Sequence, residues 1–110
     1  MEFLRHLPTE SPENLAELIQ CRPGQVVSMS LYQSGDVQMT PLAFDGGEGV
    51  SEEHYPGGTM YLLAEGKMTL KIGSAKHRME QGQVFMVPAG ALHSLRGEIP
   101  FKLLQITAKQ

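Results

Sequence analysis

The stretch 82–97 constrains the fold of this chain most, because glycine, proline and histidine recur in it at fixed intervals. Five residues separate Gly82 from Pro88, one separates Pro88 from Gly90, and two separate Gly90 from His93. A glycine has no Cβ and adopts a positive φ at little cost, and Pro-x-Gly favours a tight turn. The stretch therefore predicts two strands joined by a turn at Pro88 and preceded by a turn at Gly82.

The strands on either side of this turn are predicted at 84–87 and 91–95. The run 84–87 is short, apolar and rich in β-branched or bulky residues, which predicts a strand buried on both faces. His93 lies in the second strand among apolar neighbours. On the residues alone, His93 has two interpretations, a hydrogen-bonded core residue or a ligand.

The spacing resembles the second motif of the cupin superfamily, Gly-x5-Pro-x-Gly-x2-His-x3-Asn, with Gly97 in the position of the asparagine. In cupins this histidine points into a small β-barrel and often binds a metal. The resemblance implies such a barrel here, with His93 facing its interior.

An earlier stretch is similar to the first cupin motif, Gly-x5-His-x-His-x3,4-Glu-x6-Gly, which completes a set of three imidazoles and one carboxylate around a divalent metal. Counting back from Gly66 places Thr59 where the family has its glutamate. The two histidine positions fall on Glu53 and Tyr55, and His54 lies between them.

This departure from the motif decides which side chains face the barrel interior. Successive side chains of a strand alternate between faces, so His54 points outward if Glu53 and Tyr55 point inward. A slip of one residue, absorbed at the glycines 57–58, would instead turn His54 inward.

Either alignment leaves at most two imidazoles at the site, those of His93 and His54. First-row metals in nitrogen and oxygen sites normally need three or more protein ligands for tight binding. We therefore expect no cofactor, although Glu53 and His93 can hold a divalent transition metal weakly, joined by His54 only if the strand slips. Glu53 and His93 can alternatively act as a proton-transfer pair.

Length and charge narrow the function classes. A chain of 110 residues suffices for one domain, and its net charge of −3 without a Lys/Arg cluster argues against nucleic acid and anionic membranes as partners. No apolar run approaches the roughly 20 residues that cross a bilayer. Cys21 is the single cysteine, so no internal disulfide forms, which suits the cytoplasm.

The 12 glycines and 7 prolines imply many turns and favour an all-β fold of short strands. We expect an arm at 1–14, a single domain at 15–110 and one short helix at about 12–20. Together with the resemblance, this predicts a small jelly-roll β-barrel of two antiparallel sheets with a short N-terminal helix. The strands are expected at 26–33, 37–44, 50–55, 59–64, 67–72, 77–79, 84–87, 91–95 and 101–107.

The functional prediction is a small-molecule-binding barrel without a complete metal site. Its polar end would be lined by Glu53, Tyr55, Thr59 and His93. The alternative is a small enzyme, either a metal-dependent dioxygenase or isomerase, or a metal-free isomerase or cyclase in which His93 and Glu53 are acid and base. The catalytic residues, if any, are not otherwise indicated. We also expect a homodimer formed through the free edge of the strand at 26–33.

Overall fold

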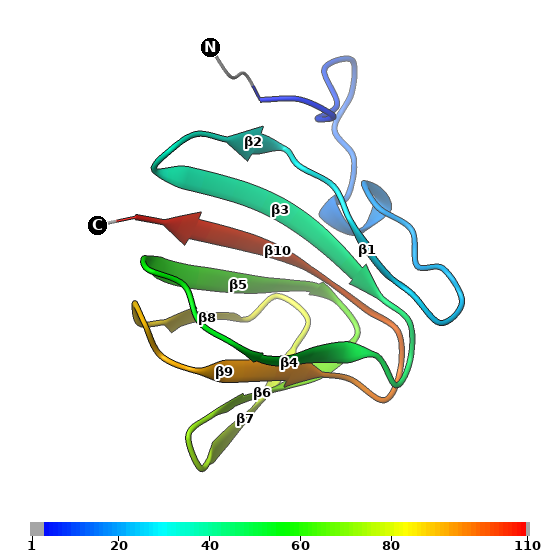
Figure 1. The fold of residues 1–110 in the computed structure, drawn as a ribbon. Coiled ribbons are helices and arrows are strands. Elements are labelled where there is room, and N and C mark those ends of the chain that lie inside the picture. Colours follow the sequence, from blue (N-terminus) through cyan, green and yellow to red (C-terminus); the bar gives the residue numbers. More distant parts are fainter. Residues whose placement is uncertain (1–3, 110) are drawn as a thin grey trace.

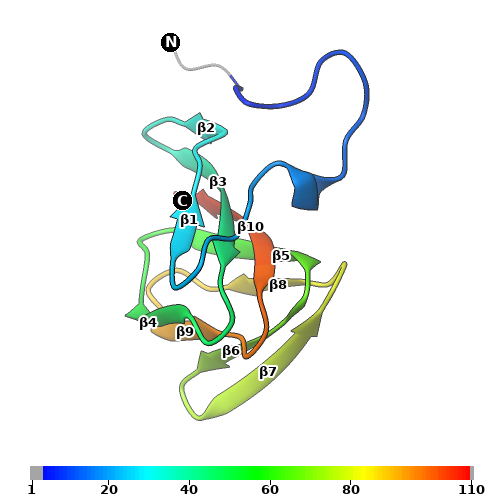
Figure 2. The same ribbon diagram turned by 90° about the vertical axis from the view of Figure 1, so that its right-hand side faces the viewer.

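The structure is a computed structural model that describes residues 4–109. Two antiparallel sheets face each other, as Figures 1 and 2 show. The six-stranded sheet has the order β1-β3-β10-β5-β8, with β2 also paired to β3, and the four-stranded sheet has the order β4-β9-β6-β7. The strands are β1 Val26–Ser28, β2 Tyr32–Gln33, β3 Val37–Phe44, β4 Gly49–Glu53, β5 Gly58–Glu65, β6 Lys67–Ile72, β7 Ala75–Glu80, β8 Val84–Val87, β9 His93–Arg96 and β10 Phe101–Ala108. This confirms the all-β, two-sheet jelly-roll architecture.

The core lies between the two sheets and follows from the two-residue period of the strands. In β5 and β6 every second side chain is buried and its neighbours are more exposed. The rings of Phe44 and Phe101, on paired strands, stack with centroids 4.3 Å apart. The buried apolar cluster consists of Phe44, Tyr61, Leu63, Met68, Leu70, Met79, Val87, Leu95, Phe101 and Leu103.

The strand β8 has the predicted bounds, but the prediction that it is buried on both faces is wrong. It forms an edge of the six-stranded sheet, paired only with β5. Val84 and Met86 are 60% and 62% exposed, whereas Val87 is buried. Phe85 is half-buried, and its ring lies 4.8 Å from that of His77. An apolar run thus occupies a strand with one solvent-exposed face.

The helix expected at 12–20 is shorter than predicted. It is a single 3-10 turn, η1 at Leu15–Glu17, preceded by Asn14 as N-cap. Residues 4–14 contain no helix or strand, and residues 1–3 of the expected arm lie outside the described residues. Among residues 4–109, no helix is long and apolar enough to cross a membrane.

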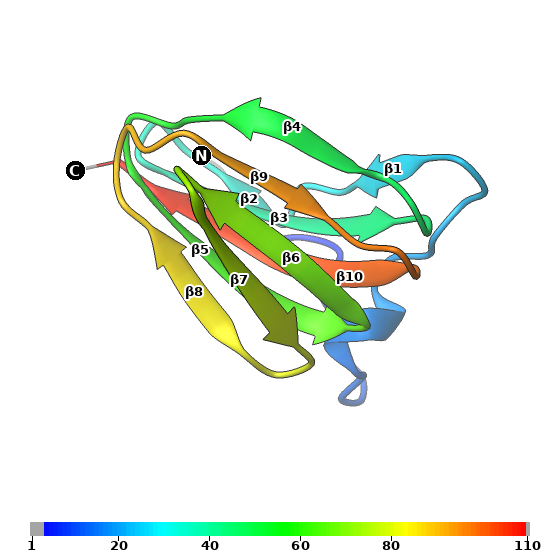
Figure 3. The same ribbon diagram turned by 90° about the horizontal axis from the view of Figure 1, so that it is seen from below.

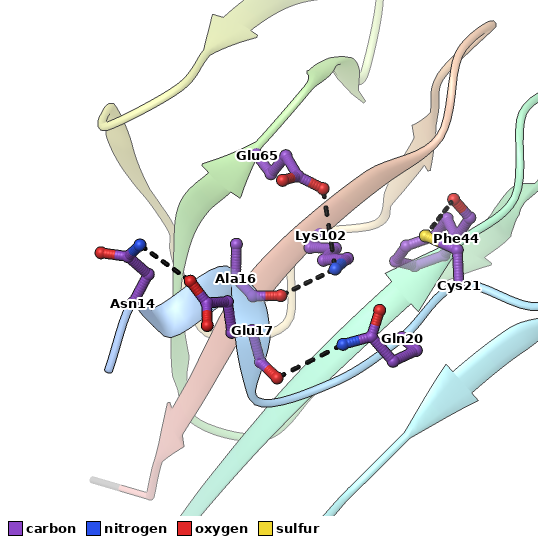
Figure 4. Close-up of polar contacts among 8 residues, drawn as sticks. All are labelled: Asn14, Ala16, Glu17, Gln20, Cys21, Phe44, Glu65 and Lys102. Carbon is purple, nitrogen blue, oxygen red and sulfur yellow. Dashed lines mark hydrogen bonds and ion pairs between the residues drawn. The ribbon is translucent and has the colours of Figure 1, made fainter. Parts of the chain in front are cut away.

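The turn η1 lies beside β10, on the outer face of the six-stranded sheet (Figures 2 and 4). There the Lys102 ammonium, although the residue is only 8% exposed, donates a hydrogen bond of 2.7 Å to the Ala16 carbonyl and lies 3.7 Å from the Glu65 carboxylate. The Cys21 thiol donates to the Phe44 carbonyl at 3.5 Å, and burial raises the pKa of this thiol. The buried ammonium thus fastens the N-terminal segment to the barrel.

The strand expected at 26–33 is broken into β1 and β2. Both pair with β3 but leave a gap opposite Pro41. The Met29 N–H donates to the Pro41 carbonyl from within this gap, so the side of Pro41 that lacks an N–H faces the break. The proline therefore limits the continuous pairing along this edge of the sheet.

Candidate functional site

Pairing between β4 and β9 brings the two motif stretches together at one end of the barrel. Glu53 lies opposite His93 in the register of these strands, beyond an irregularity that follows Val50. The turn of the second motif is attached to the first, because the Gly90 N–H donates to the Tyr55 carbonyl at 2.8 Å. The positive φ of 88° at Gly82 confirms the turn predicted before β8.

His93 is a buried residue with both ring nitrogens engaged. It is 2% exposed, its Nδ1 lies 3.0 Å from the Ala91 carbonyl oxygen, and its Nε2 lies 2.7 Å from the Tyr61 hydroxyl. Because a carbonyl oxygen only accepts, Nδ1 carries a proton and donates to Ala91. In the neutral ring Nε2 then accepts from the Tyr61 hydroxyl. This is the hydrogen-bonded core environment, one of the two interpretations left open by the sequence.

Tyr61 is the residue that the sequence analysis missed. It is fully buried, and its ring meets that of His93 edge-on, with centroids 5.6 Å apart. Burial, followed by the charges of Tyr55 and Glu53, raises the pKa of its hydroxyl, which keeps this group protonated as a donor. The available signal was the period of β5, because Thr59 and Tyr61 are two residues apart and share one face.

Thr59 is also buried on this inner face. It is 1% exposed, and its hydroxyl lies 3.3 Å from that of Thr107 on the paired strand β10. Both hydroxyls have their partner within the protein. Thr59 thus contributes to the packed wall of the barrel at the position where the family has a glutamate.

Glu53 and Tyr55 form the accessible part of the polar end. Both are half-buried, and the Tyr55 hydroxyl donates to a Glu53 carboxylate oxygen at 2.9 Å. Burial, and then this hydrogen bond, raise the pKa of the Tyr55 hydroxyl, while a hydrogen bond with Gln105 opposes the shift. The Tyr55 and His93 rings lie 6.1 Å apart. Of the proposed set, Glu53 and Tyr55 are hydrogen-bonded to each other, whereas Thr59 and His93 are bonded to Thr107 and Tyr61.

His54 is exposed, whereas Glu53 and Tyr55 on either side of it are half-buried. This alternation corresponds to the alignment of the first motif in which His54 faces away from the interior. Adjoining Tyr55 is a hollow of about 120 Å³, which Gln38 and Thr107 also line. It opens at the end of the barrel where β3 begins and β10 ends.

These residues do not fit the metal site that the family resemblance implies. The Nε2 lone pair of His93 is directed at the Tyr61 hydroxyl, and His54 is exposed. Within residues 4–109, no group of three or more His, Cys, Asp or Glu side chains is arranged to hold an ion. No buried side-chain nitrogen or oxygen of these residues lacks a hydrogen-bond partner. The half-buried groups at this end are a carboxylate and a phenol, which can both form hydrogen bonds.

Residues 42–107 match the cupin domain family. A cupin superfamily protein from Desulfitobacterium hafniense, known from its crystal structure, is 42% identical to this chain, with a TM-score of 0.95 over 98% of this chain and 99% of that one. A conserved protein of unknown function from Streptococcus pyogenes is 24% identical, with a TM-score of 0.92 over 100% and 96% of the two chains. KdgF from a Halomonas species is 15% identical, with a TM-score of 0.72 over 81% and 83%, and shows a shared fold alone. The comparison with curated proteins gave no match. The matched domain and the relative from Desulfitobacterium show that this chain belongs to the cupin family.

Proposed function

We propose that this cupin domain binds a small polar molecule at the open end of its barrel, through Glu53 and Tyr55, without a metal. The observation that carries the proposal is the 2.9 Å hydrogen bond between these half-buried side chains, of which Tyr55 lines a hollow. The pair presents a carboxylate that accepts and a phenol oxygen that both donates and accepts. A ligand with hydroxyl or amide groups complements it.

The size of the hollow indicates how such a ligand would lie. A volume of about 120 Å³ is below the range of roughly 300–1,000 Å³ typical of ligand pockets. The ligand would therefore enter the barrel end with one polar group and leave the rest outside. Only the side of the ligand near Tyr55 would be enclosed by protein.

Thr59 and His93 have a supporting part in this proposal. They are 1% and 2% exposed, and their polar atoms already have partners inside the barrel. They hold the wall behind the binding pair, whereas Glu53 and Tyr55 touch the ligand. The enzyme alternative is less supported, because no hydrogen bond within residues 4–109 joins Glu53 to His93 and the imidazole is enclosed.

The test compares Glu53→Gln with Glu52→Gln, since Glu52 is an exposed neighbour of the same chemistry. A panel of small polyols, hydroxy acids and amides is screened for ligands that raise the melting temperature of tag-free protein. A true ligand should stabilise the wild type and Glu52→Gln, but should lose most of its effect on Glu53→Gln and Tyr55→Phe. Stoichiometric metal in the purified protein, or stabilisation that Glu53→Gln retains in full, would contradict the proposal.

We also propose that two copies associate through the six-stranded sheet. The broken edge at β1 and β2 is shorter than the sequence suggested, but Val84 and Met86 leave an apolar surface on the outer face of β8. Light scattering should give the mass of two chains, and Met86→Glu should return it to that of one. Location in the cytoplasm, expected from the single cysteine, stays a prediction.

A further inference from the structure

The outer face of the four-stranded sheet gathers more than half of the basic residues of the chain. The chain has 9 lysine and arginine residues in all. Five of them line one open hollow of about 990 Å³ over β6, β7 and β9, and Figure 3 shows these strands side by side. They are Lys67, Lys71, Lys76, Arg78 and Arg96. We call this surface the basic face.

Strand pairing creates this basic face from positions that are scattered in the sequence. One row across the strands runs from Lys76 through Lys71 to Ser94. The next row runs from Arg78 through Thr69 to Arg96. Neighbouring strands are about 4.8 Å apart, and same-face residues along a strand are about 6.8 Å apart. Four cations and two hydroxyl groups therefore lie within a patch about 10 Å across.

The charge of the basic face is largely unbalanced. Lys67 has an acidic neighbour, Glu80, at 3.9 Å, and Glu98 also lines the hollow. Within residues 4–109, the other four cations form no ion pair with an acidic side chain. Lys71 lies directly opposite Lys76, an arrangement that destabilises an antiparallel pair. A chain with a net charge of −3 thus keeps a local excess of positive charge that an anion would relieve.

The floor of the hollow adds neutral donors to this charge. Thr69 and Ser94 are half-buried between the exposed cations, so their hydroxyls lie at the base of the patch. Arginine donates two parallel hydrogen bonds to a phosphate, and lysine and hydroxyl groups donate single bonds. We propose that the basic face binds a small molecule that carries at least two phosphate groups.

Two observations favour a small molecule over a nucleic acid. The volume of about 990 Å³ lies within the range of roughly 300–1,000 Å³ found for small-molecule sites. No aromatic side chain lines the hollow, so it lacks the platform on which bases of a single strand stack. The spacing of the two cation rows fits two anionic groups a few ångströms apart. This site lies on the face of the sheet opposite to the barrel interior and is independent of the function proposed above.

The test uses tripolyphosphate as the probe, titrated into the full chain at low ionic strength and followed by calorimetry. Tripolyphosphate should bind more tightly than inorganic phosphate, and its affinity should fall as salt is added. The variant with Arg78→Gln and Arg96→Gln should bind at least about tenfold more weakly, because each lost charge-assisted bond contributes appreciably to affinity. Arg22→Gln, which removes one charge from the exposed segment between η1 and β1, should change the affinity by less than about twofold.

Three outcomes would overturn the proposal. The first is the absence of tripolyphosphate binding by wild-type protein at low salt. The second is an equal loss of affinity in Arg22→Gln and in the double variant, which would indicate attraction by net charge alone. The third is tighter binding of a single-stranded oligonucleotide or of a polyglutamate peptide than of tripolyphosphate, since the face would then serve a macromolecule. Circular dichroism of each variant establishes that the substituted, exposed residues leave the fold intact.

Discussion

Replacing Tyr61 by phenylalanine tests the central polar contact of the barrel. The substitution removes one hydroxyl and keeps the ring that packs edge-on against His93. The imidazole Nε2, which now accepts a hydrogen bond of 2.7 Å, would then be left in a site only 2% exposed. The variant therefore isolates a single buried hydrogen bond.

The expected cost follows from this burial. A buried polar atom that loses its partner costs about 1–3 kcal/mol. The total stability of a small domain is about 5–15 kcal/mol, so the loss is readily measured. The free energy of unfolding of Tyr61→Phe, from urea titration followed by fluorescence or circular dichroism, should be lower by about 1–3 kcal/mol.

Tyr32→Phe provides the matched control. Tyr32 lies in β2, is half-buried, and its hydroxyl makes no hydrogen bond within the described residues 4–109. Its substitution should change the free energy of unfolding by less than about 0.5 kcal/mol. If Tyr61→Phe is as mild as this control, the hydroxyl does not bond to the imidazole, and the argument that His93 is enclosed and unavailable would be refuted.

Three further predictions concern the fold. Phe85→Ala should lower the free energy of unfolding, measured by urea titration, by about 2 kcal/mol because the ring is half-buried. Val84→Ala should change it by less than about 0.5 kcal/mol. Equal losses in the two variants would contradict the position of β8 at an edge of the sheet. Gly97→Ala should lower the free energy of unfolding by about 1–3 kcal/mol in the same assay, because an added Cβ would lie 2.5 Å from the Phe101 ring. An unchanged free energy of unfolding would mean that the ring moves aside freely. Burial raises the folded-state pKa of Tyr61 above its usual value near 10, so the contribution of this group to stability is complete below pH 10 and is lost as the pH rises further. Above pH 10 the free energy of unfolding of the wild type should therefore fall by up to about 1.4 kcal/mol per pH unit more than that of Tyr61→Phe. Parallel alkaline unfolding curves of the two proteins would contradict this prediction.

The sequence predicted most of the strands because their signals are local. The bounds of β3, β6 and β8 agree with the predicted ranges, since turn residues mark both ends of each strand. The burial of β8 was not predictable in this way. An apolar run indicates a strand, but whether one face meets solvent depends on which strand becomes the edge of the sheet.

The predicted length of the N-terminal helix was wrong for a related reason. We expected a helix at about 12–20, but a helix of this length is marginal without tertiary packing. In the structure, η1 is a single turn, and the Ala16 carbonyl accepts a hydrogen bond from the buried Lys102 ammonium. A contact between residues so far apart in the sequence, 16 and 102, cannot be predicted from the sequence around either residue.

The candidate site was predicted as a set of positions but not as a set of contacts. Alternation grouped Glu53, the last residue of β4, with Tyr55 two residues further along, and these two side chains are hydrogen-bonded to each other. The partner of His93 comes from β5 in the opposite sheet, and only the packing of the two sheets determines it. The motif comparison drew attention to Thr59 and passed over Tyr61, which shares its face.

The hydrogen bond between Tyr61 and His93 also bears on where this barrel can bind a ligand. Here a fully buried phenol occupies the space next to the imidazole, and both ring nitrogens have protein partners. This enclosure is the reason why we propose binding at the half-buried pair of the barrel end and on a surface outside the barrel. The basic face lies on the outer side of the four-stranded sheet, whereas Glu53 belongs to the polar end of the barrel, so the two proposed sites share no side chain. Substitutions without shared partners act additively, and the failure of either proposal leaves the other unaffected.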